Sequence, residues 1–116
     1  MDKALKRANM GLKDMGTMEV NEAFSSVTIA CGKILADELG HDKSQCDFSM
    51  AGDFKLGGKV NPNGGAIALG HPTGASGCRL PVTMLYEMER EKLSYGLAAL
   101  CVGFGMGTCV IIEREG

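Results

Sequence analysis

The stretch Asn63-Gly64-Gly65-Ala66-Ile67-Ala68-Leu69-Gly70-His71-Pro72-Thr73-Gly74-Ala75-Ser76-Gly77 decides how this chain is expected to fold. Short apolar runs alternate with glycine here, so the backbone must turn tightly or approach another part of the molecule closely. The residues that follow have helical spacing over 76–92. The apolar face of that helix consists of Leu80, Met84, Leu85 and Met88. A glycine-rich loop therefore leads into a helix, with His71 just ahead of the helix N-terminus.

The pattern of apolar residues around this stretch predicts an α/β fold. The expected elements are a helix over 2–10, a strand over 18–20, a helix over 22–39 that stops at Gly40, a loop over 41–58, the helix over 76–92, and strands over 95–102 and 108–113. Residues 66–69 fit either a strand or a helical turn. Pro81 lies inside the predicted helix and is expected to bend it. The sequence thus predicts helices packed on a mixed sheet that ends in a β-hairpin.

Length and charge limit the possible functions. The chain has 116 residues, of which 45% are hydrophobic and 22% charged, and its formal net charge is −2. This length suits a single domain over residues 1–116 with its own core. The charge and the absence of Trp disfavour nucleic acid as a partner, and no apolar run approaches the length of a membrane span. No secretory signal is seen, so the cytoplasm or an organelle matrix is expected.

The cysteines predict free thiols and no metal. Their number, five, is odd and no C-x-x-C pair occurs, so a zinc ribbon or a disulfide framework is not expected. A reducing compartment fits this pattern. Packing or surface positions are assigned to Cys31, Cys46, Cys78 and Cys109, and a surface position to His41.

Asn21 lies where the first predicted strand meets a helix, and two interpretations of it stay open. Its side chain can cap the helix by accepting an unpaired backbone N–H. Alternatively, its amide points into a site at the end of the strand, where open α/β sheets bind their ligands. The sequence around it is Asn21-Glu22-Ala23-Phe24.

His71 and Cys101 also have a structural and a functional interpretation. A single histidine is usually a surface or satisfied core residue, but Gly70 before it and the helix after it favour a close approach and a neutral imidazole. A free cysteine is usually a small buried apolar residue. Cys101, however, ends an apolar strand beside the glycine-rich turn 103–107, which also suits a thiolate site. That turn precedes a strand rather than a helix, so it is not a phosphate-binding loop.

Taken together, these clusters resemble the thiolase family in order and spacing. The matching motifs are Asn21-Glu22-Ala23-Phe24, then Asn63 to Pro72, then Gly74-Ala75-Ser76-Gly77, then Gly96-Leu97 leading to Cys101-Val102-Gly103. The resemblance covers nearly the whole chain, from about residue 4 to residue 114. Thiolases make and break the bond between two acyl groups carried on coenzyme A. The resemblance therefore implies the C-terminal lobe of such an enzyme, with acyl-CoA thioesters as substrates and no bound cofactor.

The resemblance also implies a role for four residues. His71 would take the proton from the nucleophilic cysteine and help bind the thioester oxygen, and Cys101 would be the acid/base that removes a proton from the second acyl group. Asn21 would hold a water that completes one oxyanion hole, and the N–H of Gly103 would contribute to the other. These roles suit a Claisen condensation, which needs a base over a carbon and donors aimed at the developing oxyanion.

The resemblance implies, finally, what this sequence does not contain. The acylated cysteine and most coenzyme A contacts belong to an N-terminal lobe, and the opening strand of the C-terminal lobe is also expected to be absent. A sheet without that strand leaves open backbone groups, which invite pairing with another chain. The expected partner is therefore an N-terminal thiolase lobe or a second copy of this chain, and the chain is expected to be inactive alone.

Two other functions stay open. One is binding or assembly without catalysis. Alternatively, Cys101 is itself a nucleophile activated by His71, which would make a small thioesterase. The sequence shows no residue that would clearly orient the imidazole in that case.

Overall fold

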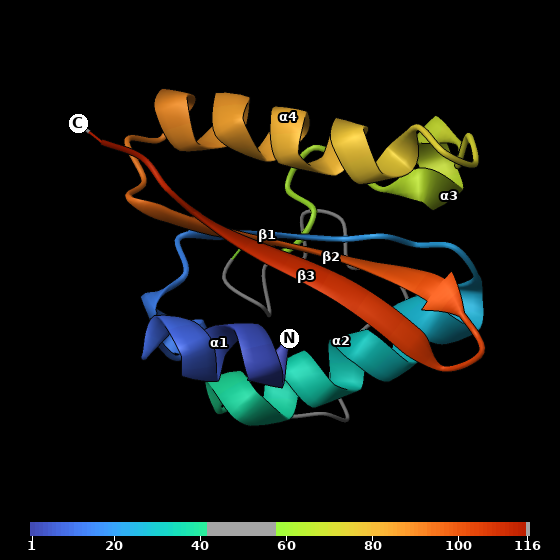
Figure 1. The fold of residues 1–116 in the computed structure, drawn as a ribbon, viewed down its shortest axis with the longest axis horizontal. Coiled ribbons are helices and arrows are strands. Elements are labelled where there is room, and N and C mark those ends of the chain that lie inside the picture. The colour runs from blue at the N-terminus through green and yellow to red at the C-terminus, as the bar shows by residue number, and fades with distance from the viewer. Residues whose placement is uncertain (42–57, 116) are drawn as a thin grey trace.

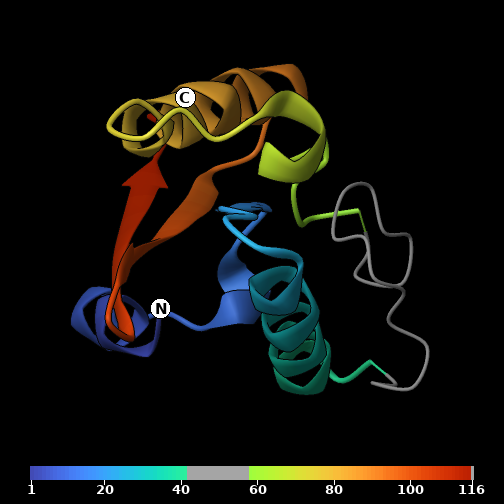
Figure 2. The same cartoon turned by 90° about the vertical axis from the view of Figure 1, so that its right-hand side faces the viewer.

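The computed structural model describes residues 1–41 and 58–115 and has three layers (Figure 1). Within these residues a mixed sheet has the order β1-β2-β3. Its strands are β1 (Thr17–Val20), β2 (Tyr95–Gly103) and β3 (Met106–Glu113), with β1 parallel and β3 antiparallel to β2. One face of the sheet is covered by α3 (Ala66–Leu69) and α4 (Ser76–Arg90), and the other by α1 (Asp2–Ala8) and α2 (Ser25–Leu39) (Figures 1 and 2). The predicted α/β class, with helices on a mixed sheet that ends in a hairpin, is confirmed.

The observed boundaries correct several predictions. The helix predicted over 22–39 begins at Ser25, with Phe24 as its N-cap, so Asn21 is not a capping residue. Residues 66–69 are helical, and α4 begins after Ala75 as its N-cap, with Pro81 inside it. A 3-10 helix over Leu12–Asp14 was not predicted. Most of the predicted 41–58 loop, and Cys46 within it, lies outside the described residues.

Two apolar layers hold the helices to the sheet. The layer on the side of α1 and α2 consists of Leu5, Met15, Met18, Val20, Leu35, Ala36, Val60 and Leu97. The layer under α4 consists of Leu80, Met84, Met88 and Ala98. Alternation along β2 explains this division, because Leu97 and Ala98 point to opposite faces. Methionine fills both layers, and its flexible side chain suits such irregular gaps.

The outer edge of β1 is covered by the residues that lead toward His71. The N–H of Met18 donates to the carbonyl of Lys59 at 2.7 Å, and the N–H of Asn61 donates to the carbonyl of Met18 at 2.8 Å. The side chain of Asn61 then bonds the backbone of Val20 on both sides. Its Oδ1 accepts from the Val20 N–H at 2.7 Å, and its Nδ2 donates to the Val20 carbonyl at 2.9 Å. One buried amide thus continues the hydrogen bonding of a strand.

A buried carboxylate joins the end of β1 to the glycine-rich stretch. Glu22 is only 5% exposed, and its Oε1 accepts from Asn61 Nδ2 at 3.2 Å while its Oε2 accepts from the Ile67 N–H at 3.0 Å. Gly65 lies against this carboxylate so closely that a Cβ there would overlap all three carboxylate atoms. A side chain at position 65 would therefore have to displace the Glu22 carboxylate, and glycine avoids this.

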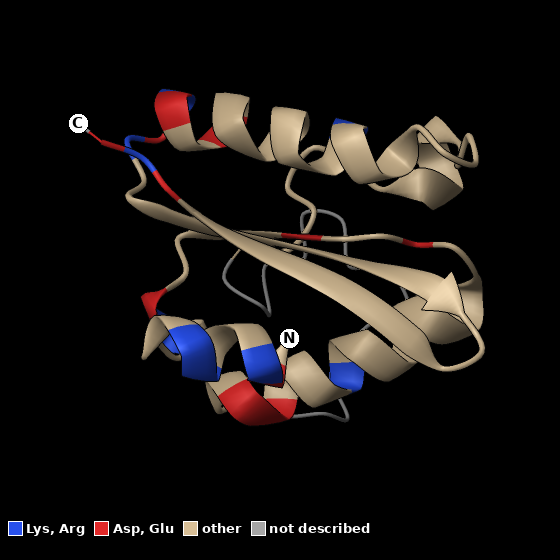
Figure 3. Cartoon of the chain, viewed as in Figure 1, with Lys and Arg blue, Asp and Glu red and all other residues tan. Residues whose placement is uncertain are grey.

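Charged side chains are confined to part of the molecule (Figure 3). They lie mainly on α1, on α2 and at the C-terminal end of α4. By contrast, the stretches 60–78 and 93–112 contain no Asp, Glu, Lys or Arg. These stretches hold α3, the start of α4 and almost all of the β2–β3 hairpin, and the charged residues Glu22 and Arg79 lie next to them.

One acidic side chain of β1 is almost completely buried. Glu19 in β1 is 1% exposed, and its Oε1 has no hydrogen-bond partner among the described residues. Burial raises the pKa of Glu19 to about 7 from its ordinary value of 4.5; nearby Arg79 lowers it, and Glu87 and Glu22 raise it further. The protonated form is therefore favoured in the folded protein.

No described helix has the combination of length and hydropathy that a bilayer span requires. Likewise, residues 1–41 and 58–115 contain no group of three or more His, Cys, Asp or Glu placed to hold a metal ion.

We expect Gly65→Ala to lower the free energy of unfolding by about 2–3 kcal/mol, because the new methyl group would displace the Glu22 carboxylate from its two donors. Urea unfolding of the purified chain measures this. Gly77→Ala is the matched control: the nearest atom to its Cβ lies 3.6 Å away, and alanine is the better helix former, so this variant should be neutral or slightly stabilised. Equal urea midpoints for Gly65→Ala and the original chain would contradict the proposed crowding.

We expect Glu19→Gln to remove a pH dependence of stability. Because the folded pKa of Glu19 is raised, the folded state binds the proton more tightly, and stability is lost as the pH rises from about 4.5 through about 7. Between about pH 5 and pH 8 the original chain should lose about 2–3 kcal/mol relative to Glu19→Gln. Urea unfolding at several pH values measures the slope, with the exposed Glu89→Gln as control. A Glu19→Gln slope that matches the original slope would rule out this titration.

Candidate functional site

Asn21 lies directly after β1 and is held by the neighbouring strand. Its N–H donates to the carbonyl of Ala99 in β2 at 2.9 Å. The side chain is 1% exposed, and its Nδ2 lies 3.4 Å from Nε2 of His71. Two residues that are fifty positions apart in the sequence thus meet, and the interpretation of Asn21 as an amide aimed into a site is favoured over a helix cap.

Two further contacts define the state of the His71 ring. Its Nδ1 lies 2.7 Å from Oγ of Ser76, and that hydroxyl lies 3.4 Å from the carbonyl of Pro72. The amide nitrogen of Asn21 can only donate, so Nε2 accepts and the ring proton is on Nδ1. His71 then donates to Ser76, which donates to Pro72. This network is satisfied by a neutral imidazole whose Nε2 lone pair faces the site.

Side chains of α4 form hydrogen bonds that hold the loop carrying His71. Arg79 donates from Nη1 to the carbonyl of Gly70 at 2.7 Å. Asn63 donates to the buried Glu87 at 2.8 Å, and Arg90 also pairs with that carboxylate. The segment between Asn63 and Gly70 is therefore tied to the same helix at both ends. His71 itself is exposed, so its ring is held firmly but remains accessible.

Cys101 is half-buried near the end of β2 and lines a cleft together with Asn21. Other residues in this cleft include Val20, Val27 and Cys31. No hydrogen bond joins Cys101 to His71 within the described chain, so Asn21 is the residue that connects the two. The structure therefore brings Asn21 and His71 into contact and places Cys101 in one cleft with Asn21.

Gly103 lies in the turn of the hairpin, where β2 and β3 shift register between Cys101 and Gly103. Its φ of 101° is in a region that favours glycine, as is the φ of 75° at Gly105. Between them Phe104 has a φ of 50° and is fully exposed. Within residues 1–41 and 58–115 no hydrogen bond joins Gly103 to His71, and Gly103 lies two residues beyond Cys101.

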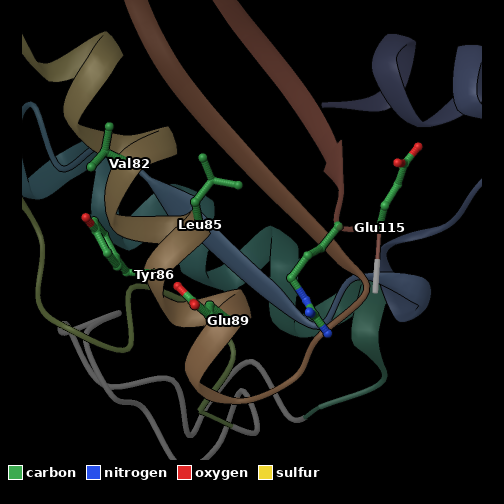
Figure 4. A pocket seen from close by; sticks show the side chains of 6 residues that line it. Val82, Leu85, Tyr86, Glu89 and Glu115 are labelled. Carbon is green, nitrogen blue, oxygen red and sulfur yellow. The ribbon is translucent and has the colours of Figure 1, made fainter.

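A second pocket lies away from these residues. It is lined by Val82, Leu85 and Tyr86 on α4 together with Glu89, Arg114 and Glu115 (Figure 4). Arg114 donates its N–H to the carbonyl of Ser94, just before β2. Cys101 lies at the opposite end of that strand, so this pocket contains none of the predicted site residues.

Several residues that position the site were not assigned from the sequence. Ser76 and Arg79 were interpreted only as parts of a helix, and Glu22 and Asn61 received no role. Ser76 also supplies what the sequence seemed to lack, a residue that orients the imidazole. A signal existed for Glu22, because an acidic residue between an apolar strand and an apolar helix is expected to be buried and paired.

Comparison with known proteins is consistent with this arrangement. A family model described as "Thiolase, C-terminal domain" matches residues 1–114. The chain is 44% identical over 113 residues to an acetyl-CoA acetyltransferase of Cupriavidus necator, with 97% of this chain and 24% of that protein covered. It is 47% identical over 111 residues to a 3-ketoacyl-CoA thiolase of Yersinia enterocolitica, with 96% and 25% covered.

A solved structure is also similar. The crystal structure of the acetyl-CoA acetyltransferase of Bacillus anthracis superimposes with a TM-score of 0.74 and 35% sequence identity, over 97% of this chain and 24% of that one. The match covers nearly the whole chain, so it includes the sheet and the residues around Asn21, His71 and Cys101. The chain spans about a quarter of the length of these relatives, and it belongs to the thiolase family as a thiolase C-terminal domain.

Proposed function

We propose that this chain supplies the acid/base half of a thiolase, which condenses or cleaves acyl-CoA once an N-terminal lobe brings the nucleophilic cysteine. The observation that supports this most directly is the contact between Asn21 and His71 beside the cleft of Cys101. The names of the relatives, acetyl-CoA acetyltransferase and 3-ketoacyl-CoA thiolase, support the substrate class.

In this proposal His71 acts first, as the base that takes a proton from the nucleophile. Its Nε2 carries the lone pair, and the contact from Asn21, at 3.4 Å, is long enough to yield to a thiol. The Nδ1 proton stays on its bond to Ser76. Proton transfer then produces an imidazolium whose second N–H is already satisfied, and Nε2–H can donate to a thioester oxygen.

Cys101 would act next, on the second acyl group. Removing a proton from the carbon beside a thioester leaves an enolate, whose negative charge needs nearby donors. Asn21 suits this need, because its buried Oδ1 has no hydrogen-bond partner among the described residues and so can accept from a water that donates onward. The N–H of Gly103, two residues beyond Cys101, is the proposed donor for the other oxyanion.

The surface around these residues suits a protein partner. Interfaces are depleted of charge at their centre, and the charge-free stretches 60–78 and 93–112 border this site (Figure 3). Large apolar side chains on these stretches and before α2 are exposed: Phe24, Ile67, Leu69, Val102, Phe104 and Met106. Because the relatives are about four times as long, we propose that the rest of a thiolase covers these stretches.

The thioesterase alternative gains no support from the geometry. It requires Cys101 to give its proton to His71, and no hydrogen bond joins them in the described part of the chain. Ser76 orients the imidazole as such an enzyme would need, yet the ring nitrogen that faces the site contacts Asn21 instead.

We expect the purified chain alone to show no thiolysis of acetoacetyl-CoA, and to become active when mixed with the N-terminal lobe of the Cupriavidus necator relative. In the mixture, His71→Ala and Cys101→Ala should each lower turnover by about 10²–10⁴-fold, as loss of a general acid or base does. His41→Ala and Cys78→Ala, both at exposed positions, are the matched controls and should retain turnover. Activity of the chain by itself, or equal losses in the controls, would contradict the proposal.

We expect Ser76→Ala to disturb the His71 tautomer. Without the hydroxyl, Nδ1 loses its acceptor, so part of the population should move the proton to Nε2, which nitrogen NMR of the ring reports. A hydrogen bond of this kind is worth about 1 kcal/mol, so turnover in the reconstituted mixture should fall by about fivefold. The exposed Ser26→Ala is the control. Unchanged ring shifts in Ser76→Ala would show that Ser76 does not hold the proton.

A further inference from the structure

The cleft beside Asn21 contains a second thiol in addition to Cys101. Cys31 belongs to α2 and Cys101 to β2, and both are half-buried side chains that line the same cleft. Cys31 also packs against the apolar layer on this side of the sheet. Two cysteines from distant parts of the sequence, one on a helix and one on a strand, thus line one cleft.

Cys101 also affects the titration of Cys31. Burial is the main cause that raises the pKa of the Cys31 thiol, and the charge of a Cys101 thiolate raises it further. Cys31 therefore remains protonated at neutral pH. Because a thiolate is the form that attacks an oxidant, the raised pKa of Cys31 disfavours it as the first thiol to react, and Cys31 is instead suited to respond to an oxidised Cys101.

We propose that Cys31 and Cys101 form a redox-sensitive pair that closes into a disulfide when the chain meets a peroxide. The Cys101 thiolate attacks one peroxide oxygen, the O–O bond breaks, and hydroxide leaves as water after taking a proton, so that Cys101 becomes a sulfenic acid. Cys31 then loses its proton and attacks that sulfur, and a second water leaves. One peroxide is reduced and two thiols are oxidised.

The consequence for activity rests on the proposed function. A disulfide removes the Cys101 thiol from proton transfer, and a reducing thiol restores it by exchange. The bond also protects Cys101, because an unresolved sulfenic acid is oxidised further to forms that thiols do not reverse. Cys31 would thus be a resolving cysteine that makes the loss of Cys101 temporary.

The neighbouring thiols provide the controls for this pairing. Cys109 lies in β3, opposite Ala99 in the register of the hairpin, and Cys78 is exposed on α4, across the sheet. Burial raises the pKa of Cys109 as well. A disulfide requires Cα atoms within about 7 Å, so the bond that forms reports which thiols the cleft brings together.

Disulfide mapping of the purified chain tests the proposal. Hydrogen peroxide is added to a dilute sample, free thiols are alkylated, and trypsin releases peptides 14–33 and 93–114, which contain Cys31 and Cys101. We expect a linked peptide pair in the original chain and in Cys109→Ser, and none in Cys31→Ser or Cys101→Ser. Circular dichroism verifies that each variant is folded. A link that persists in Cys101→Ser, or Cys101 oxidised without any link, overturns the proposal.

Two additions separate this proposal from its alternatives. Mixing ¹⁵N-labelled and unlabelled chain distinguishes a bond within one chain from a bond between chains, and a mixed-isotope pair as the main product would overturn the inference. In the reconstituted mixture, dithiothreitol should restore turnover after peroxide in the original chain but not in Cys31→Ser. The peptide map does not depend on turnover. It therefore tests the disulfide between Cys31 and Cys101 even if no thiolase activity is found.

Discussion

The buried carboxylate of Glu22 is the constraint on which the site depends. A charge enclosed this fully is costly unless donors surround it, and here the donors are the amide of Asn61 and the N–H of Ile67. Both belong to the segment 61–67, which leads to His71. The hydrogen bonds to the Glu22 carboxylate therefore fix that segment against the end of β1. Asn21 is the residue directly before Glu22. The contact between Asn21 and His71 follows from this attachment.

Asn61 extends the same constraint to the sheet. Its side chain completes the hydrogen bonds of Val20 while its backbone N–H bonds Met18, so one residue serves both the edge of β1 and the carboxylate. Edge strands with unsatisfied backbone groups tend to pair with other chains. Covering β1 in this way protects that edge and, at the same time, directs the chain toward the site. The outer edge of β3 pairs with no other described strand.

The sequence predicted the architecture better than it predicted the residues that hold the site residues in place. Apolar periodicity located β2 and α4, because burial on one face leaves a regular pattern. It placed the start of α2 three residues early, since Glu22 looks like a good helix residue and its buried partners lie far along the chain. The pairings of Ser76 with His71, and of Glu22 with Asn61, are likewise contacts between residues whose proximity depends on the folded backbone. Motif resemblance predicted roles for Asn21, His71 and Cys101, but it did not predict which residues hold them in place.

The residues that hold His71 in place all belong to this chain. This matters for the proposal that the chain works with a separate lobe. The hydrogen bonds of Ser76, Arg79 and Glu22 are made to other residues of this chain. The orientation of His71 therefore does not require a partner. Preorganised groups bind and react without first being ordered. In the proposed assembly, a partner lobe would need only to bring its nucleophile to Nε2 and to cover the charge-free stretches. The stability of the site and the affinity of the lobes would then be separate properties: the Glu22 network would determine the former, and exposed side chains such as Ile67 and Phe104 the latter.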